Sequence, residues 1–302
     1  MPSFPSPVAH ITQPSVWRRS SKTGRVPGTP PSALHENNAN YNTATGTNAL
    51  WYNTAGSSNT AVGVSALYRN TTSGNTAVGA GALQNNTTSV ENTAVGYQTL
   101  LNNIGGPFGS SSTATGYLAL TSNQTGGLNT AVGAHALRGN TTGHFNTAIG
   151  ASALRVNNSI GNTATGSVAL INNTTGDSNT ANGWQALQTN VNGSGNSGFG
   201  AQALYTNTAG SANTALGEHA LYKTTGNSNT AAGAFALSTS TGSSNIALGY
   251  SAGSALTSGS NNIDIGSVGL AADLGKIRIG TKGTQTATFV AGIYNVSEPA
   301  AG

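Results

Sequence analysis

Small apolar residues recur at a fixed interval along most of the chain, inside the pattern Asn-Thr-Ala-x-Gly-x-x-Ala-Leu. The stretch SNTAVGVSAL at 58–67 is followed by GNTAVGAGAL at 74–83 and ENTAVGYQTL at 91–100. Successive patterns start 16 or 17 residues apart, with one step of 20. A fixed period this short predicts stacked units, none of which can bury an apolar face alone. The fourteen starts are Asn42, Asn59, Asn75, Asn92, Ser112, Asn129, Asn146, Asn162, Asn179, Asn196, Asn213, Asn229, Asn245 and Asn262.

The sequence of each unit predicts a short strand (Thr-Ala-x), a glycine turn, a second short segment ending in Ala-Leu, and a polar loop. The loops, such as YRNTTSG at 68–74, contain turn-forming residues, and Asn and Gly there tolerate a left-handed backbone. About seventeen residues are too few for a packed helical hairpin but enough for one coil of a β-solenoid. We therefore predict an all-β fold, a parallel β-solenoid of about fourteen coils over residues 37–282, with neighbouring strands about 4.7–4.9 Å apart.

Stacking gives each recurring residue type a role. A column of Asn can form amide ladders like those of cross-β stacks, and a column of Gly allows a turn with positive φ. Ala fits a thin coil, and Leu fills its interior. The residue after Ala varies from Val62 to Asn182 and Phe199, so we predict that it lies on the surface or at an interface. The predicted structural residues in representative coils are Asn59, Thr60, Ala61, Gly63, Leu67, Asn75, Gly79, Leu83, Asn129, Gly133 and Leu137.

So thin a core is weak by itself. Each coil would bury about one Leu and a few methyl groups. At ~25 cal/mol per Å² of buried apolar surface, this hardly offsets the chain entropy of ~1.5 kcal/mol per residue. Association with further copies of the chain would repair the deficit.

Composition and charge narrow the possible partners. Charged residues make up 6% of the chain, and residues 37–266 contain four basic and four acidic side chains. A nucleic-acid-binding surface needs a basic stripe, which this neutral body lacks. There is no Cys, which excludes disulfides and thiolate metal sites, and no apolar run approaches membrane-spanning length. We expect no cofactor, no metal, no nucleic acid and no membrane insertion.

The two ends differ from the repeats. Residues 1–36 are basic and contain seven Pro, and they lack the apolar core of a secretory signal. We interpret them as a disordered leader or as an upstream extension of the reading frame. IDIG at 263–266 and KIRIG at 276–280 are expected to form closing coils, and residues 283–302 a C-terminal transition segment.

The motifs SNTAVG and SNIALG resemble the NSVAIG-type repeat in the head domains of trimeric autotransporter adhesins. The resemblance covers residues 37 to about 282. It implies a left-handed parallel β-roll in which three chains pack around one axis, as an intertwined or side-by-side homotrimer. The repeat here is longer than that of those heads. Their membrane anchor and coiled-coil stalk have no counterpart in this sequence, so secretion and anchoring are not implied.

The tail carries a second resemblance. GTKGTQTATFVAGIYNV at 280–296 is similar to the segment that precedes the C-terminal intramolecular chaperone of phage tail-fibre-like proteins. That resemblance implies a chaperone that trimerises the fibre and is then cleaved off. No chaperone follows in this sequence, as expected of a truncated or matured product.

Catalytic motifs occur only as coincidental matches. GSGNSG at 193–198 fits a dinucleotide-binding pattern but is followed by no predicted helix. GYSAG at 249–253 fits a nucleophile elbow, yet no His follows Ser251. His135 and His219 share one column, several coils apart and without further metal ligands. We expect no enzymatic activity; a solenoid hydrolase would need clustered carboxylates.

Three aromatic residues are candidate ligand contacts. Phe108 lies in the inserted stretch NNIGGPFGSSS between Asn92 and Ser112, and inserted loops often carry function. Trp184 and Tyr205 could stack on glycans or pack at an interface. Asn-x-Ser/Thr sequons start at Asn70, Asn86, Asn140 and Asn173, which we interpret as loop composition rather than glycosylation.

Two functional hypotheses follow. The first is a non-catalytic structural and adhesive fibre segment of a bacterial cell-surface adhesin or a phage-like tail fibre, presenting a repetitive surface to a host glycan or protein receptor. It would be extracellular, on the cell surface or in a virion; the lack of a visible signal peptide favours the virion. The second is a monomeric β-solenoid that binds a regular lattice such as ice, or a glycan, through a Thr column. That column would contain Thr43, Thr60, Thr76, Thr93, Thr113, Thr130, Thr147, Thr163, Thr180, Thr214 and Thr230, and Ser197, Ile246 and Ile263 interrupt it.

Overall fold

The computed structural model describes residues 39–106 and 110–287. The described residues all belong to one unit, Ser32–Gly302. The predicted leader 1–36, the candidate Phe108 and most of the segment 283–302 lie outside the described residues. The described part contains strands, turns and bends but no helix, and thus none that could cross a membrane.

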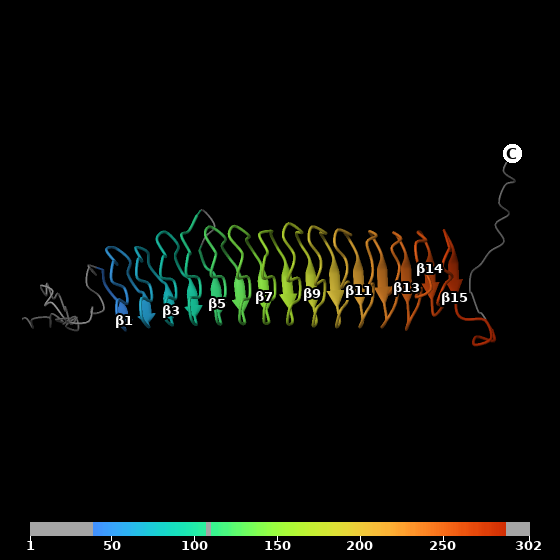
Figure 1. Cartoon of the computed structure of the whole chain (residues 1–302), viewed down its shortest axis with the longest axis horizontal. Coiled ribbons are helices and arrows are strands. Elements are labelled where there is room, and N and C mark those ends of the chain that lie inside the picture. The colour runs from blue at the N-terminus through green and yellow to red at the C-terminus, as the bar shows by residue number, and fades with distance from the viewer. Residues whose placement is uncertain (1–38, 107–109, 288–302) are drawn as a thin grey trace, which may run out of the picture. The chain divides into compact units, whose positions relative to one another are not determined.

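Fifteen strands of three residues each form one parallel sheet, in which the strands follow one another in sequence order (Figure 1). Fourteen of them start one residue after the predicted pattern starts, and the fifteenth is the predicted closing coil KIRIG. The prediction of a parallel β-solenoid of about fourteen coils is confirmed. The strands are β1 (Thr43–Thr45), β2 (Thr60–Val62), β3 (Thr76–Val78), β4 (Thr93–Val95), β5 (Thr113–Thr115), β6 (Thr130–Val132), β7 (Thr147–Ile149), β8 (Thr163–Thr165), β9 (Thr180–Asn182), β10 (Ser197–Phe199), β11 (Thr214–Leu216), β12 (Thr230–Ala232), β13 (Ile246–Leu248), β14 (Ile263–Ile265) and β15 (Ile277–Ile279).

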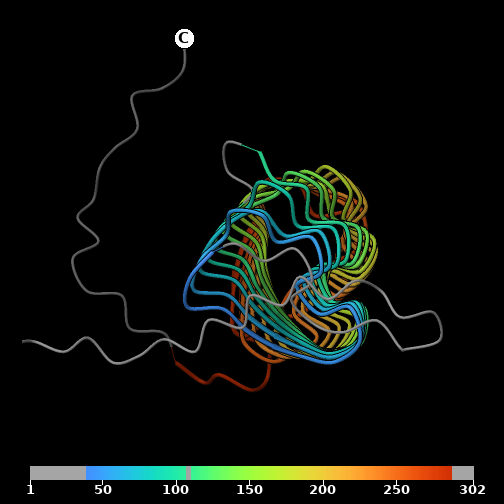
Figure 2. The same cartoon turned by 90° about the vertical axis from the view of Figure 1, so that its left-hand side faces the viewer.

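Equivalent residues of neighbouring coils lie directly above one another. In β2 and β3, Thr60 pairs with Thr76, Ala61 with Ala77 and Val62 with Val78. The same register holds through the insertion, where Ala94 of β4 pairs with Ala114 of β5. Viewed along the stack, the coils superimpose around a common interior (Figure 2). Each position of the repeat therefore forms a column that runs the length of the sheet.

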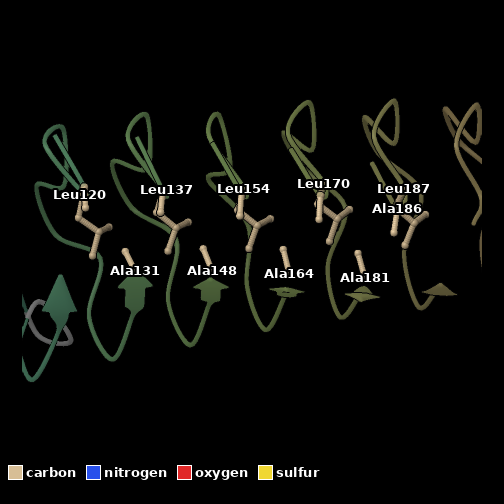
Figure 3. Close-up of a cluster of buried hydrophobic side chains, with 14 of the residues drawn as sticks. Leu120, Ala131, Leu137, Ala148, Leu154, Ala164, Leu170, Ala181, Ala186 and Leu187 are labelled. Carbon is tan, nitrogen blue, oxygen red and sulfur yellow. The ribbon is translucent and has the colours of Figure 1, made fainter. Parts of the chain in front are cut away.

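The core consists of two columns of Ala and one of Leu, as predicted. The strand Ala and the Ala-Leu pair are buried in nearly every coil, and they face each other across the interior (Figure 3). Twelve Leu residues are the largest fully buried side chains: Leu50, Leu67, Leu83, Leu100, Leu120, Leu137, Leu154, Leu170, Leu187, Leu204, Leu221 and Leu237. Thr99 replaces Ala in one coil, where its hydroxyl donates a hydrogen bond to the Gly96 carbonyl at 2.7 Å.

The coil closes through left-handed residues, which include a column that the loop composition did not suggest. Each Leu of the Ala-Leu column has φ between 47° and 55°, as do other non-glycine residues such as Ser65 and His135 nearby. This conformation costs an L-residue roughly 1–2 kcal/mol, and burial of the Leu side chain offsets that cost. In the loop 68–74, Gly74 has φ of 76°, as the loop composition suggested, and Asn261 in a later loop has φ of 60°. Asn70 is not left-handed, and its buried carboxamide belongs to a ladder instead.

The Gly column is required by close contact as well as by φ. Gly166 has φ of 135°, and a Cβ atom added there would lie 2.4 Å from the carbonyl oxygen of Gly183 in the next coil. The same clash recurs at equivalent glycines from Gly46 to Gly233, where the added atom would lie 2.3–2.7 Å from the next coil's backbone. Only a residue without a Cβ lets the coils approach to the strand spacing at this corner.

The predicted Asn ladder is present and joins each coil to the next. The Oδ1 of Asn162 accepts the backbone N–H of Asn179 at 2.9 Å, and its Nδ2 donates to the carbonyl of Gly176 at 2.9 Å. The N–H-to-side-chain bond repeats from Asn42 to Lys276 at 2.9–3.0 Å, with one exception. At the insertion, the Ser112 hydroxyl replaces Asn and accepts from Asn129 at 3.3 Å.

A second Asn column, which the sequence interpretation missed, runs through the polar loops. The Nδ2 of Asn86 donates to the Oδ1 of Asn70 at 2.7 Å, and Asn190 bonds to Asn173 at 2.8 Å in the same way. The column includes the sequon residues Asn70, Asn86, Asn140 and Asn173, which are fully buried. In the folded coil these side chains are structural and inaccessible to glycosylation.

We predict that Asn146→Ala lowers the free energy of unfolding by about 2–4 kcal/mol. The substitution leaves the backbone N–H of Asn162 buried without its partner, which costs about 1–3 kcal/mol. It also removes one of the two amide donors to the Ser159 carbonyl, the other being Asn157, and a lost hydrogen bond costs about 0.5–1.5 kcal/mol. Urea unfolding followed by circular dichroism measures the change. Thr147→Ala, at the neighbouring outward-facing position, is the control and should cost less than about 1 kcal/mol. Equal losses in the two variants would contradict the ladder's role.

We also predict that Gly166→Ala destabilises the protein far more than Gly195→Ala. Both glycines have positive φ, but a Cβ at Gly195 would have its nearest neighbour 3.9 Å away, whereas one at Gly166 would overlap the next coil's backbone. The loss at Gly195 should be the strain term of roughly 1–2 kcal/mol. At Gly166 it should exceed about 3 kcal/mol. Urea unfolding of both variants measures the two losses of unfolding free energy. Similar losses would show that backbone strain alone accounts for glycine at position 166.

Candidate interaction surfaces

The outer face of the sheet carries two columns of side chains. Successive strand residues point to opposite faces, and the middle Ala points inward, so the first and third residues point outward. The third residue is exposed in thirteen strands and half-buried in β8 and β12. The expectation that the residue after Ala lies outside the tight core is therefore confirmed. Together with the Thr column it forms a regular two-column array, which we call the outer sheet face.

The outer sheet face becomes strongly apolar toward its C-terminal end. In β13, β14 and β15 the Thr column is replaced by Ile246, Ile263 and Ile277. The neighbouring column holds Leu248, Ile265 and Ile279 in the same strands, and Leu248 and Ile279 are 52% and 68% exposed. Large contiguous apolar patches on soluble proteins usually mark interaction sites.

Charged residues replace the inner Ala column at the same end. Ala247 pairs with Asp264, and Asp264 pairs with Arg278, in register. Asp264 is 1% exposed, and its Oδ2 has no hydrogen-bond partner in the described structure. Arg278 donates to both carboxylate oxygens of Asp273, with 2.8 Å between Nη2 and Oδ1. This cluster ends the apolar core, and an inward-pointing charge also disfavours pairing of a further strand at the sheet edge.

The two carboxyl groups respond to pH in opposite directions. Burial raises the pKa of Asp264, and the nearby Asp273 carboxylate raises it further. Its contribution to stability is therefore present in acid and is lost as the pH rises through the raised value. The hydrogen bond from Arg278 lowers the pKa of Asp273. That contribution is present near neutral pH and is lost as the pH falls through the lowered value.

Aromatic side chains gather on the side of the coil that follows the glycine turn. Trp184 is 54% exposed. Tyr205 is half-buried and stacks on Tyr222 of the next coil, with ring centroids 5.1 Å apart and planes 8° from parallel. Because that contact covers a ring face, Tyr205 is a weaker candidate for stacking on a ligand than Trp184.

The structure places Ser251, His219 and His135 in one regular column of the repeat. Ser251 lies in the column of left-handed residues, where its backbone N–H donates to Ala234. His219 lies beside Glu218, with 3.5 Å between Nδ1 and Oε1, and His135 packs edge-on against Tyr117. Among the described residues, no group of three or more His, Cys, Asp or Glu side chains could hold a metal ion.

Comparisons with known proteins identify no relative of this chain: no family model, no curated protein and no solved structure matches it.

We predict that Asp264→Ala stabilises the last coils at pH 7 by about 1–3 kcal/mol, because it removes a buried oxygen without a partner. The gain should shrink as the pH falls and the native carboxyl becomes protonated. Thermal unfolding of the variant and the wild type between pH 4 and pH 8 measures it. The exposed Glu91→Ala is the control and should show no such pH-dependent gain. A loss of stability in the Asp264 variant at pH 7 would contradict the prediction.

Proposed function

We propose that this chain is a non-catalytic structural segment of an adhesive fibre, which associates with further copies through the outer sheet face. The observation that carries the proposal is the apolar C-terminal part of that face, where Ile or Leu occupies both outward columns in three successive strands. Burial of apolar surface drives association, and a stack with one Leu and a few Ala per coil gains stability from a partner that covers it.

The number of chains comes from the resemblance to trimeric adhesin heads. In that arrangement three copies lie side by side, in parallel and in register, and their outer sheet faces meet around one axis. Parallel alignment would bring together the apolar C-terminal parts of the outer sheet faces of all three chains. We place such a fibre on a bacterial surface, as part of an adhesin, or in a phage-like tail, where the remaining sides of each coil are free to contact a host glycan or protein.

Light scattering after size exclusion tests the association. We predict three chains per particle for the wild type, and a shift toward one chain for Leu248→Asp and for Ile265→Asp, because each buries a charge in the interface. Val191→Asp places the same charge on an exposed loop residue and should leave the mass unchanged. A wild-type monomer with β-type circular dichroism would contradict the proposal.

The second candidate is a monomeric solenoid that binds a regular lattice such as ice. It is favoured by one observation: the Thr column and the next outward column share one face and repeat at the strand spacing. Only β1, β5 and β8 carry Thr in both columns, which weakens it. An ice-recrystallisation assay of the monomeric fraction tests this candidate. Inhibition of recrystallisation by the wild type that is lost in Thr147→Leu would support binding to ice. A wild type that does not inhibit recrystallisation would rule this candidate out.

A further inference from the structure

The column that directly follows the glycine turn holds four exposed aromatic side chains, Tyr97, Tyr117, Trp184 and Tyr250, and the last two lie four coils apart. Trp184, just after β9, and Tyr250, just after β13, are 54% and 76% exposed. At the strand spacing, four coils place them roughly 19 Å apart along the stack. Between them the column holds Ala201, Glu218 and Ala234. We call these five residues, with Gln185, Gln202, His219 and Phe235 of the adjacent column, the aromatic strip.

The adjacent column supplies polar groups and a second aromatic surface. Gln202 Nε2 donates to Gln185 Oε1 at 2.6 Å, so the two amides form a short ladder beside Trp184. His219 and Phe235 stack with centroids 5.1 Å apart and planes 7° from parallel. Glu218 remains largely exposed, with its side chain 59% accessible. The strip therefore alternates aromatic rings, amides and a carboxylate along one side of the rod.

The backbone beneath the strip is held rigidly. Four successive N–H groups donate to the carbonyl of the coil before: Gln202 to Trp184, His219 to Ala201, Phe235 to Glu218 and Ser251 to Ala234, at 2.8–3.0 Å. The side chains are thus presented at a fixed spacing before any ligand arrives. Such pre-organisation lowers the entropy cost of binding.

We propose that the aromatic strip binds a linear neutral oligosaccharide that lies along the rod. A sugar ring offers apolar C–H faces to aromatic rings and hydroxyl groups to amides and carboxylates, and this strip offers both kinds of partner. Exposed Trp and Tyr with nearby polar groups are typical of sites that recognise such amphipathic ligands. A polyanion such as nucleic acid is disfavoured, because Glu218 lies at the centre of the strip.

The inference rests on the proposed function, since it names the ligand class for an attachment fibre. Binding along a single rod does not require self-association, however, so the two proposals fail separately. Loss of the oligomer with binding retained would remove only the association. An oligomer without binding would remove only the oligosaccharide site.

Isothermal titration calorimetry of the full chain with cellohexaose, maltohexaose and chitohexaose tests the proposal by measuring the Kd of each oligosaccharide. We expect at least one to bind with a Kd in or below the millimolar range. Trp184→Ala and Tyr250→Ala should each weaken that binding at least tenfold. Tyr97→Ala, in the same column but outside the strip, should leave the Kd within about twofold. The conservative Trp184→Phe and Tyr250→Phe should retain most of the affinity, because they keep an aromatic ring.

Two results would overturn the proposal. The first is a wild-type chain, folded by circular dichroism, that binds none of the three oligosaccharides. The second is binding that is unchanged in both alanine variants, which would place the ligand elsewhere. Light scattering on the same samples reports whether any variant has altered the association state.

Discussion

A buried carboxamide in almost every coil holds the stack together. Its oxygen accepts the backbone N–H of the equivalent residue in the next coil, and in most coils its nitrogen donates to a loop carbonyl. The side chain therefore satisfies a backbone donor that the three-residue strand leaves unpaired, and it fixes the loop against the strand. An unpaired buried group would cost about 1–3 kcal/mol in every coil. This requirement explains why Asn precedes almost every strand.

The same stacking turns every sequence position into a surface column. A small apolar core fills the interior of the stack, so sequence variation is concentrated in the columns outside it. The outer sheet face changes from Thr and Val toward Ile and Leu at the C-terminal end. The side after the glycine turn gathers aromatic rings around β10–β13. The two proposals, self-association and oligosaccharide binding, therefore concern different sides of the stack.

The sequence was informative where one residue has one physical role. The period located every strand, and the inward Ala, the Leu column and the turn at Gly63 followed from size and backbone freedom. It was misleading where two roles compete. Asn70 was assigned to a polar, turn-forming loop, although its carboxamide is buried in a ladder. The left-handed conformation at Leu67 was not foreseen either, because Leu rarely adopts it and only closure of the coil compensates for the strain.

Hydrogen exchange of the backbone amides in the Asn column tests the central claim most directly, because exchange reports how often each hydrogen bond opens. We predict strong protection at Asn146, Asn162 and Asn179 and their equivalents throughout the stack. Protection should be weaker at Asn129, whose acceptor is the Ser112 hydroxyl at 3.3 Å. Exchange of the column amides at the rate of an unfolded chain would show that the Asn column does not hold the coils together.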